Sequence, residues 1–301
     1  MRVAVLIISS DEKQRWILEK SIWKQYMNSH EEVDCFFLET DLSLPSKSVK
    51  VSDNLIKVGC EDGIMKGIFR KTILALQHLE NKYDFYIRTN LSTFWRFDLL
   101  LPFLHDIYKK DVFYGGWAWK ELTENQYISG FSIIVNKKVC NLLVKEGLKH
   151  YEKSGRDDVI IGRIIFKVLS ELYTGGCTNE NAYNFNPSAQ YEDGSCEFSK
   201  SVVSDRKKYT LRGCMDSIAN NYKPNADYDD GKRCRYATPL NDKCFYWEYE
   251  DTPHHYQIKD SIKTIKSDKR FIIRTHVHSS YTTQKNILNA LLKEFKYENK
   301  K

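Results

Sequence analysis

Two neighbouring carboxylates stand at the start of the segment Asp157-Asp158-Val159-Ile160-Ile161-Gly162. A carboxylate can take the proton of an attacking hydroxyl group, which is general-base catalysis. Carboxylates at the start of a helix also accept hydrogen bonds from its free N–H groups and suit the helix dipole. From the residues alone we favour the capping role for this pair.

Two tryptophans and two histidines are further candidates for binding. Trp117 and Trp119 stand in an aromatic, glycine-rich stretch, and their rings could stack on a sugar or equally well pack in the core. His276 and His278 are two residues apart on an expected strand, so they face the same side and could help to hold a metal ion. Because no third ligand is evident, we favour solvent-facing or packed histidines.

The elements that must position these residues alternate between strands and helices. We expect strands at 3–8, 33–38, 84–90, 112–114 and 132–135, and helices at 11–27, 61–80, 99–108, 137–151 and 157–173. The first strand is continuously apolar, as in a sheet that is covered on both faces. The opening order therefore predicts a Rossmann-like α/β fold. The glycine-rich fingerprint of dinucleotide sites is absent from the sequence, which argues against such a site.

The spacing of apolar residues also predicts which side of the first helix is buried. One face should carry Trp16, Ile17, Ile22, Trp23 and Tyr26.

A duplicated module interrupts the periodic sequence between residues 175 and 236. Residues 176–196 and 213–234 align at an offset of 37, so that Cys177 matches Cys214. The acidic residues of the modules could bind calcium, although Asp-Gly is also an ordinary turn signal. These acids are Glu192, Asp193, Asp227, Asp229 and Asp230.

The four clustered cysteines predict one disulfide within each module, Cys177–Cys196 and Cys214–Cys234. Each loop contains few core-forming residues, so it needs a covalent link to hold its shape. A shared zinc site is the first alternative, but neither module has the closely spaced cysteine pair that zinc sites use. Free thiols in a reducing compartment are the second alternative.

Periodic sequence resumes after the modules, with an expected strand at 271–278 and an expected helix at 285–295. We therefore divide the chain into residues 1–174, the modules at 175–236, and residues 237–301, which should complete the first domain.

Four segments follow one another in a particular order. They are the helix segment with Arg15 and Trp23, the Lys71-Thr72 pair, the strand 83–92, and the Ser129-Gly130 turn with the acidic segment 157–162. This order resembles the β-1,3-glycosyltransferase and fringe family, which has the GT-A fold, over about residues 1–170. The cysteine modules resemble a short repeat found in proteins of large DNA viruses and marine microbes.

The resemblance implies a glycosyltransferase that moves a sugar, with inversion, from a nucleotide sugar such as a UDP-sugar to a hydroxyl of a glycan or protein acceptor. It implies Asp158 as the base with Asp157 beside it, and an acceptor site with Trp117, Trp119, Ser129 and Gly130. The donor site it implies contains Arg15, Lys71, Arg88, Asn90, Ser92 and Lys259.

One segment departs from the family. Asn90-Leu91-Ser92 stands where members carry the acidic triplet that holds a divalent ion. Hard cations prefer carboxylate oxygens, so the usual metal site is doubtful, and Asn90, His276 and His278 are the remaining candidate ligands. Either basic side chains neutralise the leaving diphosphate, or the domain binds without turnover. The alternatives are thus a non-catalytic carbohydrate- or nucleotide-binding protein, or an interaction protein that acts through its cysteine repeats.

The composition sets outer limits on these functions. Of the 301 residues, 42% are hydrophobic and 29% charged, which is typical of a globular protein. The net charge of +6 suits an anionic small substrate and does not require a nucleic-acid partner. We see no signal peptide and no membrane-spanning stretch, which predicts a cytoplasmic protein, in the host cytoplasm or the virion if it is viral.

Overall fold

The computed structural model describes residues 1–117, 127–173, 175–192 and 195–196, together with six short segments at 212–213, 217–218, 228–229, 244–247, 255–256 and 272–275. The residues singled out above that lie outside the described residues are Trp119, Lys259, His276, His278, Cys214, Cys234 and the acidic residues Asp193, Asp227 and Asp230.

The described chain forms a mixed eight-stranded sheet in the order β13-β7-β8-β5-β1-β2-β4-β3. Its strands are β1 (Val3–Ile8), β2 (Val33–Thr40), β3 (Val49–Ser52), β4 (Leu55–Val58), β5 (Phe85–Asn90), β7 (Tyr114–Trp117), β8 (Ile133–Asn136) and β13 (Cys244–Trp247). Strands β4, β2, β1 and β5 run parallel, while β8 is antiparallel to both β5 and β7. The sheet is therefore mixed α/β and compatible with the Rossmann-like fold that the sequence predicted.

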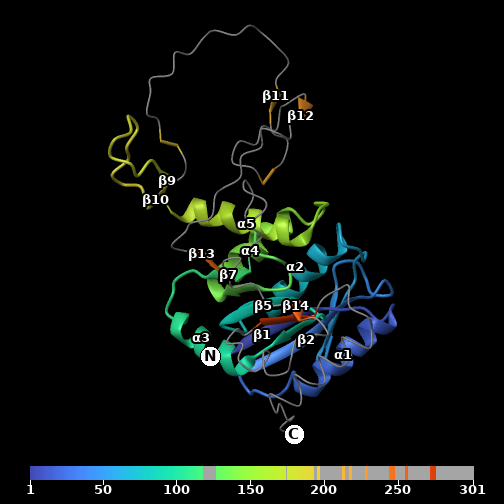
Figure 1. Cartoon of the computed structure of the whole chain (residues 1–301). Helices are drawn as coiled ribbons and strands as arrows, with labels where there is room; N and C mark the ends of the chain where they lie inside the picture. The colour runs from blue at the N-terminus through green and yellow to red at the C-terminus, as the bar shows by residue number, and fades with distance from the viewer. Residues whose placement is uncertain are drawn as a thin grey trace.

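Helices cover both faces of this sheet (Figure 1). They are α1 (Gln14–Tyr26), α2 (Gly67–Leu79), α3 (Phe97–Ile107), α4 (Lys137–Lys149) and α5 (Asp157–Leu172). Side chains of α2, α4 and α5 pack with one face of the sheet in one core cluster, and those of α1 and α3 pack with the other face in a second. Ala4 and Leu6 of β1 belong to the first cluster, while Val3 and Val5 belong to the second, as strand alternation requires. The continuous apolar sequence of β1 follows from this burial on both faces.

The two strands that flank β1 are each preceded by a helix, one on either face of the sheet. Helix α1 leads to β2, which pairs with β1 on one edge, and α2 leads to β5, which pairs with β1 on the other. The strand order thus reverses between β1 and β5. In open α/β sheets, ligands bind at such a reversal, outside the carboxyl ends of the strands.

Three local features differ from the sequence predictions. Helix α2 begins at Gly67 rather than near residue 61, because the chain turns at Gly63 and the backbone at Gly67 lies too close to the carbonyl of Glu61 for a side chain. The hairpin of β3 and β4 was not expected; it turns at Asp53, whose φ of 46° is tolerated by aspartate. Ile17 does not share the buried face of α1, since it is 51% exposed.

Short strands from the C-terminal part pair with the first domain. Strand β13 runs parallel to β7, and β15 (Ile272–Thr275) pairs antiparallel with β6 (Thr93–Trp95). Strand β14 (His255–Tyr256) pairs with β15 in turn. These pairings attach the described C-terminal segments to residues 1–174, and the completion of that domain by residues 237–301 as a whole stays a prediction.

The two cysteine modules have the same strand pairing. In the first, β9 (Gly175–Gly176) pairs with β10 (Tyr191–Glu192), and in the second, β11 (Arg212–Gly213) pairs with β12 (Tyr228–Asp229). Every residue of the second pairing lies 37 positions after its counterpart in the first. The duplication therefore extends from sequence to backbone register.

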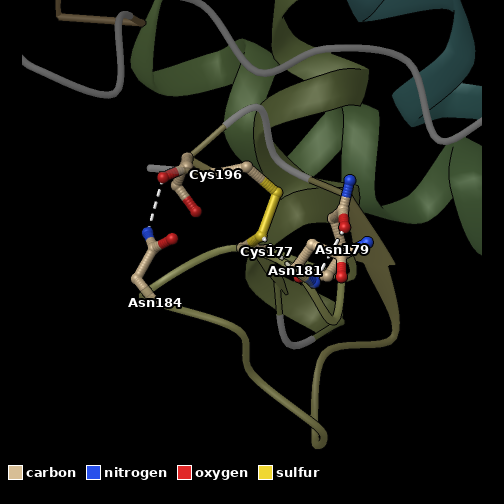
Figure 2. The surroundings of a disulfide bond; sticks show 6 residues. Cys177, Asn179, Asn181, Asn184 and Cys196 are labelled. Carbon is tan, nitrogen blue, oxygen red and sulfur yellow. Dashed lines mark hydrogen bonds between the residues drawn. A yellow bond between two sulfur atoms is a disulfide. The ribbon is translucent and has the colours of Figure 1, made fainter. Parts of the chain in front are cut away.

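A disulfide joins Cys177 to Cys196 in the first module, which is the pairing expected there (Figure 2). The Asn184 side chain donates a hydrogen bond of 2.5 Å to the Ser195 carbonyl, and the Asn181 N–H donates one of 3.0 Å to the Asn179 side chain. Cys35, Cys60 and Cys140 are buried free thiols. Burial raises the pKa of Cys60 to about 11, so this thiol stays protonated at neutral pH.

We expect the double change Cys177→Ser and Cys196→Ser to destabilise the first module by about 3 kcal/mol, because the open loop gains chain entropy when it unfolds. Hydrogen exchange should then accelerate at the Asn186 and Ala189 amides, which donate to Cys177 and Asn186 carbonyls. Non-reducing peptide mapping of the unmodified protein is the control. A disulfide between the two modules in that map would contradict the structure.

Candidate functional site

The candidate site lies at the carboxyl end of β5, where the strand order of the sheet reverses. Arg88 and Asn90 point toward the face covered by α2 and α5, since they alternate with Ile87 and Thr89 on the other side. The first turn of α5, with Asp157 and Asp158, meets them there. Sequence-distant segments are thus brought to the edge at which α/β folds bind ligands.

Arg88 is the centre of this group. Its Nη2 atom lies 2.6 Å from Oδ2 of Asp157, and both side chains are less than 10% exposed. Its Nη1 atom donates to the side-chain oxygen of Asn90 at 2.9 Å and to the carbonyl of Gly130. The Nε atom is buried without a hydrogen-bond partner, which leaves the guanidinium one unused donor.

Gly130 leaves room for the Arg88 side chain. A Cβ atom at position 130 would overlap the Arg88 guanidinium as it lies here, so a larger residue would have to displace the end of this side chain. Ser129, beside it, is buried and donates its N–H to the Trp117 carbonyl at 2.8 Å. The Ser129-Gly130 turn therefore supports Arg88 through its backbone.

Asp158 is held by three donors. Its Oδ2 accepts from the Gly130 N–H at 3.3 Å and from Arg156 Nη2 at 3.0 Å, while Oδ1 accepts from the Val159 N–H at 3.0 Å. The last contact satisfies a free amide within the first turn of α5, while the N-cap position itself belongs to Arg156, whose side chain makes no capping hydrogen bond. Asp158 is only 6% exposed, so a base role requires the acceptor hydroxyl to reach a nearly buried carboxylate.

Burial dominates the electrostatics of Asp157. Loss of water raises the pKa of this carboxyl group, the Arg88 charge partly lowers it, and the neighbouring Asp158 raises it again. Nearby, burial and the charge of Asp158 raise the pKa of Tyr127, whose ring lies under the Arg156 guanidinium at 5.3 Å. The group of Arg88, Arg156, Asp157 and Asp158 is electrically balanced.

Two other expected donor-binding cations are already paired. Lys71 is 1% exposed, and its ammonium lies 3.2 Å from Asp62. Burial alone would raise the pKa of Asp62, but Lys71 and the Gly63 N–H hold it below its usual value. Arg15 forms a 3.0 Å pair with Glu19, one turn along α1. The structure therefore does not bring Lys71 or Arg15 into contact with Arg88.

The triplet Asn90-Leu91-Ser92 does not fit a divalent ion. The side-chain oxygen of Asn90 accepts from Arg88, so an ion there would have to displace a guanidinium. Leu91 is fixed through its carbonyl, which accepts from Trp23 Nε1 at 3.0 Å, and Ser92 is buried. Among the residues that the structure describes, no group of three or more His, Cys, Asp or Glu side chains is placed to hold a metal ion.

Trp117 packs in the interior. It is 5% exposed and lies 5.5 Å from Phe131, ring centre to ring centre, within the core cluster beneath α1 and α3. Its ring has no free face for a sugar, so core packing is the alternative that describes Trp117.

A second polar cluster, at the carboxyl ends of β1 and β2, was missed by sequence reasoning. The Lys20 ammonium lies 2.7 Å from Asp11 and 2.6 Å from Glu39, and Ser9 also donates to Glu39 at 3.0 Å. Burial lowers the pKa of Lys20, but hydrogen bonds to the two carboxylates raise it overall. The sequence did carry a signal for this cluster. Glu39 stands near the carboxyl end of an apolar strand beside β1, and ligands of open α/β sheets bind outside the carboxyl ends of the strands.

A cavity of about 870 Å³ lies at the other end of the strands, near the amino end of β5. Its walls include Phe85 at the start of β5, Asn136 at the end of β8, and the exposed side chains of Lys110 and Lys145. None of the expected site residues lines it, so the cavity and the Arg88 group are separate features.

The chain matches no protein-family model and no curated protein. The described residues include no helix whose length and apolar content would let it cross a bilayer. The family resemblance therefore stays a prediction.

We expect Arg88→Ala to destabilise the protein by about 3 kcal/mol at pH 7.5, because it leaves the Asp157 carboxylate buried and unpaired. A carboxyl group whose pKa is raised in the folded state takes up protons on folding, so its contribution to stability grows as pH falls toward its ordinary pKa of about 3.9. The difference in unfolding free energy between the Arg88→Ala variant and the unmodified protein should therefore be smaller at pH 5 than at pH 7.5. Urea unfolding at both pH values measures it.

Lys138→Ala is the matched control, because it removes an exposed pair with Asp111. That change should cost less than about 1 kcal/mol at either pH. An Arg88 variant that is as stable as this control would show that the buried pair is not needed.

Proposed function

We propose that the α/β domain is a GT-A glycosyltransferase that moves a sugar from a nucleotide-sugar donor to an acceptor hydroxyl, with inversion. The observation that carries the proposal is the buried Arg88 guanidinium, held between Asn90 and Asp157 at the carboxyl end of β5. Ligands of α/β folds bind at this edge, and the order of motifs in the sequence points to the same site. Fold analogy alone would not establish activity.

In the proposed reaction, Asp158 takes the proton of the acceptor hydroxyl as its oxygen attacks the anomeric carbon of the sugar. The bond from that carbon to the diphosphate breaks, and the electron pair leaves with the diphosphate. Arg156 holds the Asp158 carboxylate through Oδ2, and the Gly130 N–H fixes the same oxygen. The backbone around Gly130 thus orients the base.

The leaving diphosphate needs positive charge that is fixed before the reaction. Arg88 supplies a cation next to the position of the family's acidic triplet, where a divalent ion does not fit. Because Arg88 and Arg156 are balanced by Asp157 and Asp158, further cations are needed. Lys259, which lies outside the described residues, stays a candidate, whereas Arg15 would have to exchange Glu19, and Lys71 would have to exchange Asp62, for the diphosphate.

The same charge balance favours a second candidate function, a nucleotide- or carbohydrate-binding protein without turnover on the same scaffold. In that case Arg88 would bind and orient the ligand, while Asp158 would only accept from the Val159 N–H in the first turn of α5. A screen for nucleotide-sugar hydrolysis, with and without manganese, separates the two functions.

Asp158→Asn should reduce transfer at least about 100-fold, since general-base catalysis contributes that much or more, and should leave donor affinity nearly unchanged. Release of nucleoside diphosphate measures turnover, and calorimetry measures donor binding. The matched control is Asp98→Asn, which alters an exposed pair with Arg96. Activity equal to that of the unmodified protein would return Asp158 to a purely capping role.

Donor binding should change by less than about tenfold when manganese is replaced by a chelator, because Asn90 is occupied by Arg88 and Leu91 offers no side-chain ligand. Titration of a UDP-sugar under both conditions tests this. Loss of binding in the chelator would show that a metal ion does hold the donor.

A further inference from the structure

The second cysteine module reaches into the α/β domain through the turn Ser217-Ile218. Ile218 is 1% exposed and belongs to the same core cluster as residues of α2, α4 and α5. The module is therefore attached to this domain by a buried apolar side chain as well as by the chain itself.

A polar chain lies beside Ile218. The Ser217 hydroxyl is 3.2 Å from Nδ1 of His150, and Nε2 of His150 is 3.2 Å from Oε1 of Glu146. Lys149 and Lys167 donate to Glu146 at 2.7 and 2.5 Å. Although burial opposes it, these hydrogen bonds hold the pKa of Glu146 at about 2, so its carboxylate is charged at neutral pH.

The state of His150 makes Ser217 a fitting partner. Burial lowers the pKa of this imidazole more than Glu146 raises it, and the charges of Lys167 and Lys153 lower it further. A neutral ring that donates from Nε2 to Glu146 keeps Nδ1 as an acceptor. The Ser217 hydroxyl can donate to that nitrogen. The second module thus supplies a partner for the ring of His150, the residue at the C-terminal end of α4.

The first module differs at the same two positions. At the offset of 37, Glu180 and Asn181 stand where the second module has Ser217 and Ile218. Asn181 is exposed, while its neighbour Ala182 is buried. The described strand pairs of the two modules share one register, and these two positions differ in their side chains.

We propose that the outer surface of α4 and α5 around His150 is a docking site for the second module, and that Ser217 and Ile218 distinguish this docked copy from the first. The second module is then a fixed part of the α/β domain. The first module, with Asn181 at the docking position and Tyr183 70% exposed, keeps the corresponding surface in solvent. This inference does not depend on transferase activity.

Exchanging the residues of the two copies in the full-length chain tests the proposal. Ile218→Asn puts the first module's residue into the second, and Asn181→Ile is the reciprocal control. Limited proteolysis with mass spectrometry should show cleavage within 213–234 accelerating at least about tenfold in Ile218→Asn, and no change in Asn181→Ile. Hydrogen exchange at the end of α4 near His150 should rise in the first variant only.

Ser217→Ala provides a milder test if the Ile218 variant does not fold. It removes only the hydroxyl that faces His150 and should accelerate the same cleavage by a smaller factor. Cleavage at the unmodified rate in Ile218→Asn would overturn the proposal, as would an equal acceleration in Asn181→Ile. If only Ser217→Ala can be studied, an unchanged rate in that variant would overturn it as well.

Discussion

The ion pair between Arg88 and Asp157 joins the end of β5 to the start of α5, and the Gly130 turn closes around it. Taking two charges out of water is costly unless further hydrogen bonds compensate for the lost hydration. Arg88 obtains such bonds from Asn90 and from the Gly130 carbonyl. The position of Asp158 follows from this pair, because the same helix turn carries it and the same glycine binds it.

The pair also shapes the chemistry of the site. A guanidinium that occupies the Asn90 oxygen supplies positive charge without metal ligands, but Asp157 cancels most of that charge at a distance. Whether such a site turns over a donor depends on the cations that surround the leaving group. The positive charge available to the leaving diphosphate therefore distinguishes the two candidate functions, transfer and binding.

Periodicity predicted much of the fold, since β1, β2 and β5 and the helices α3, α4 and α5 lie within a few residues of their expected positions. The hairpin of β3 and β4 was missed because its strands are four residues each and partly exposed, so they carry a weak apolar signal. Ile17 was placed on the wrong side of α1, since an apolar residue can be exposed without any sign in the sequence.

The sequence by itself determined the α/β class, the duplicated modules and the pairing of Cys177 with Cys196, because each depends on local spacing or on repetition along the chain. Only the tertiary structure decided which charges meet. Arg88 pairs with Asp157 across 69 positions, whereas Lys71 pairs with Asp62 on its own side of the sheet. Likewise, Ile218 is buried because it joins the core cluster that contains residues of α2, α4 and α5. Partner choice and burial arise from packing between distant segments, and no pattern along one segment contains that information.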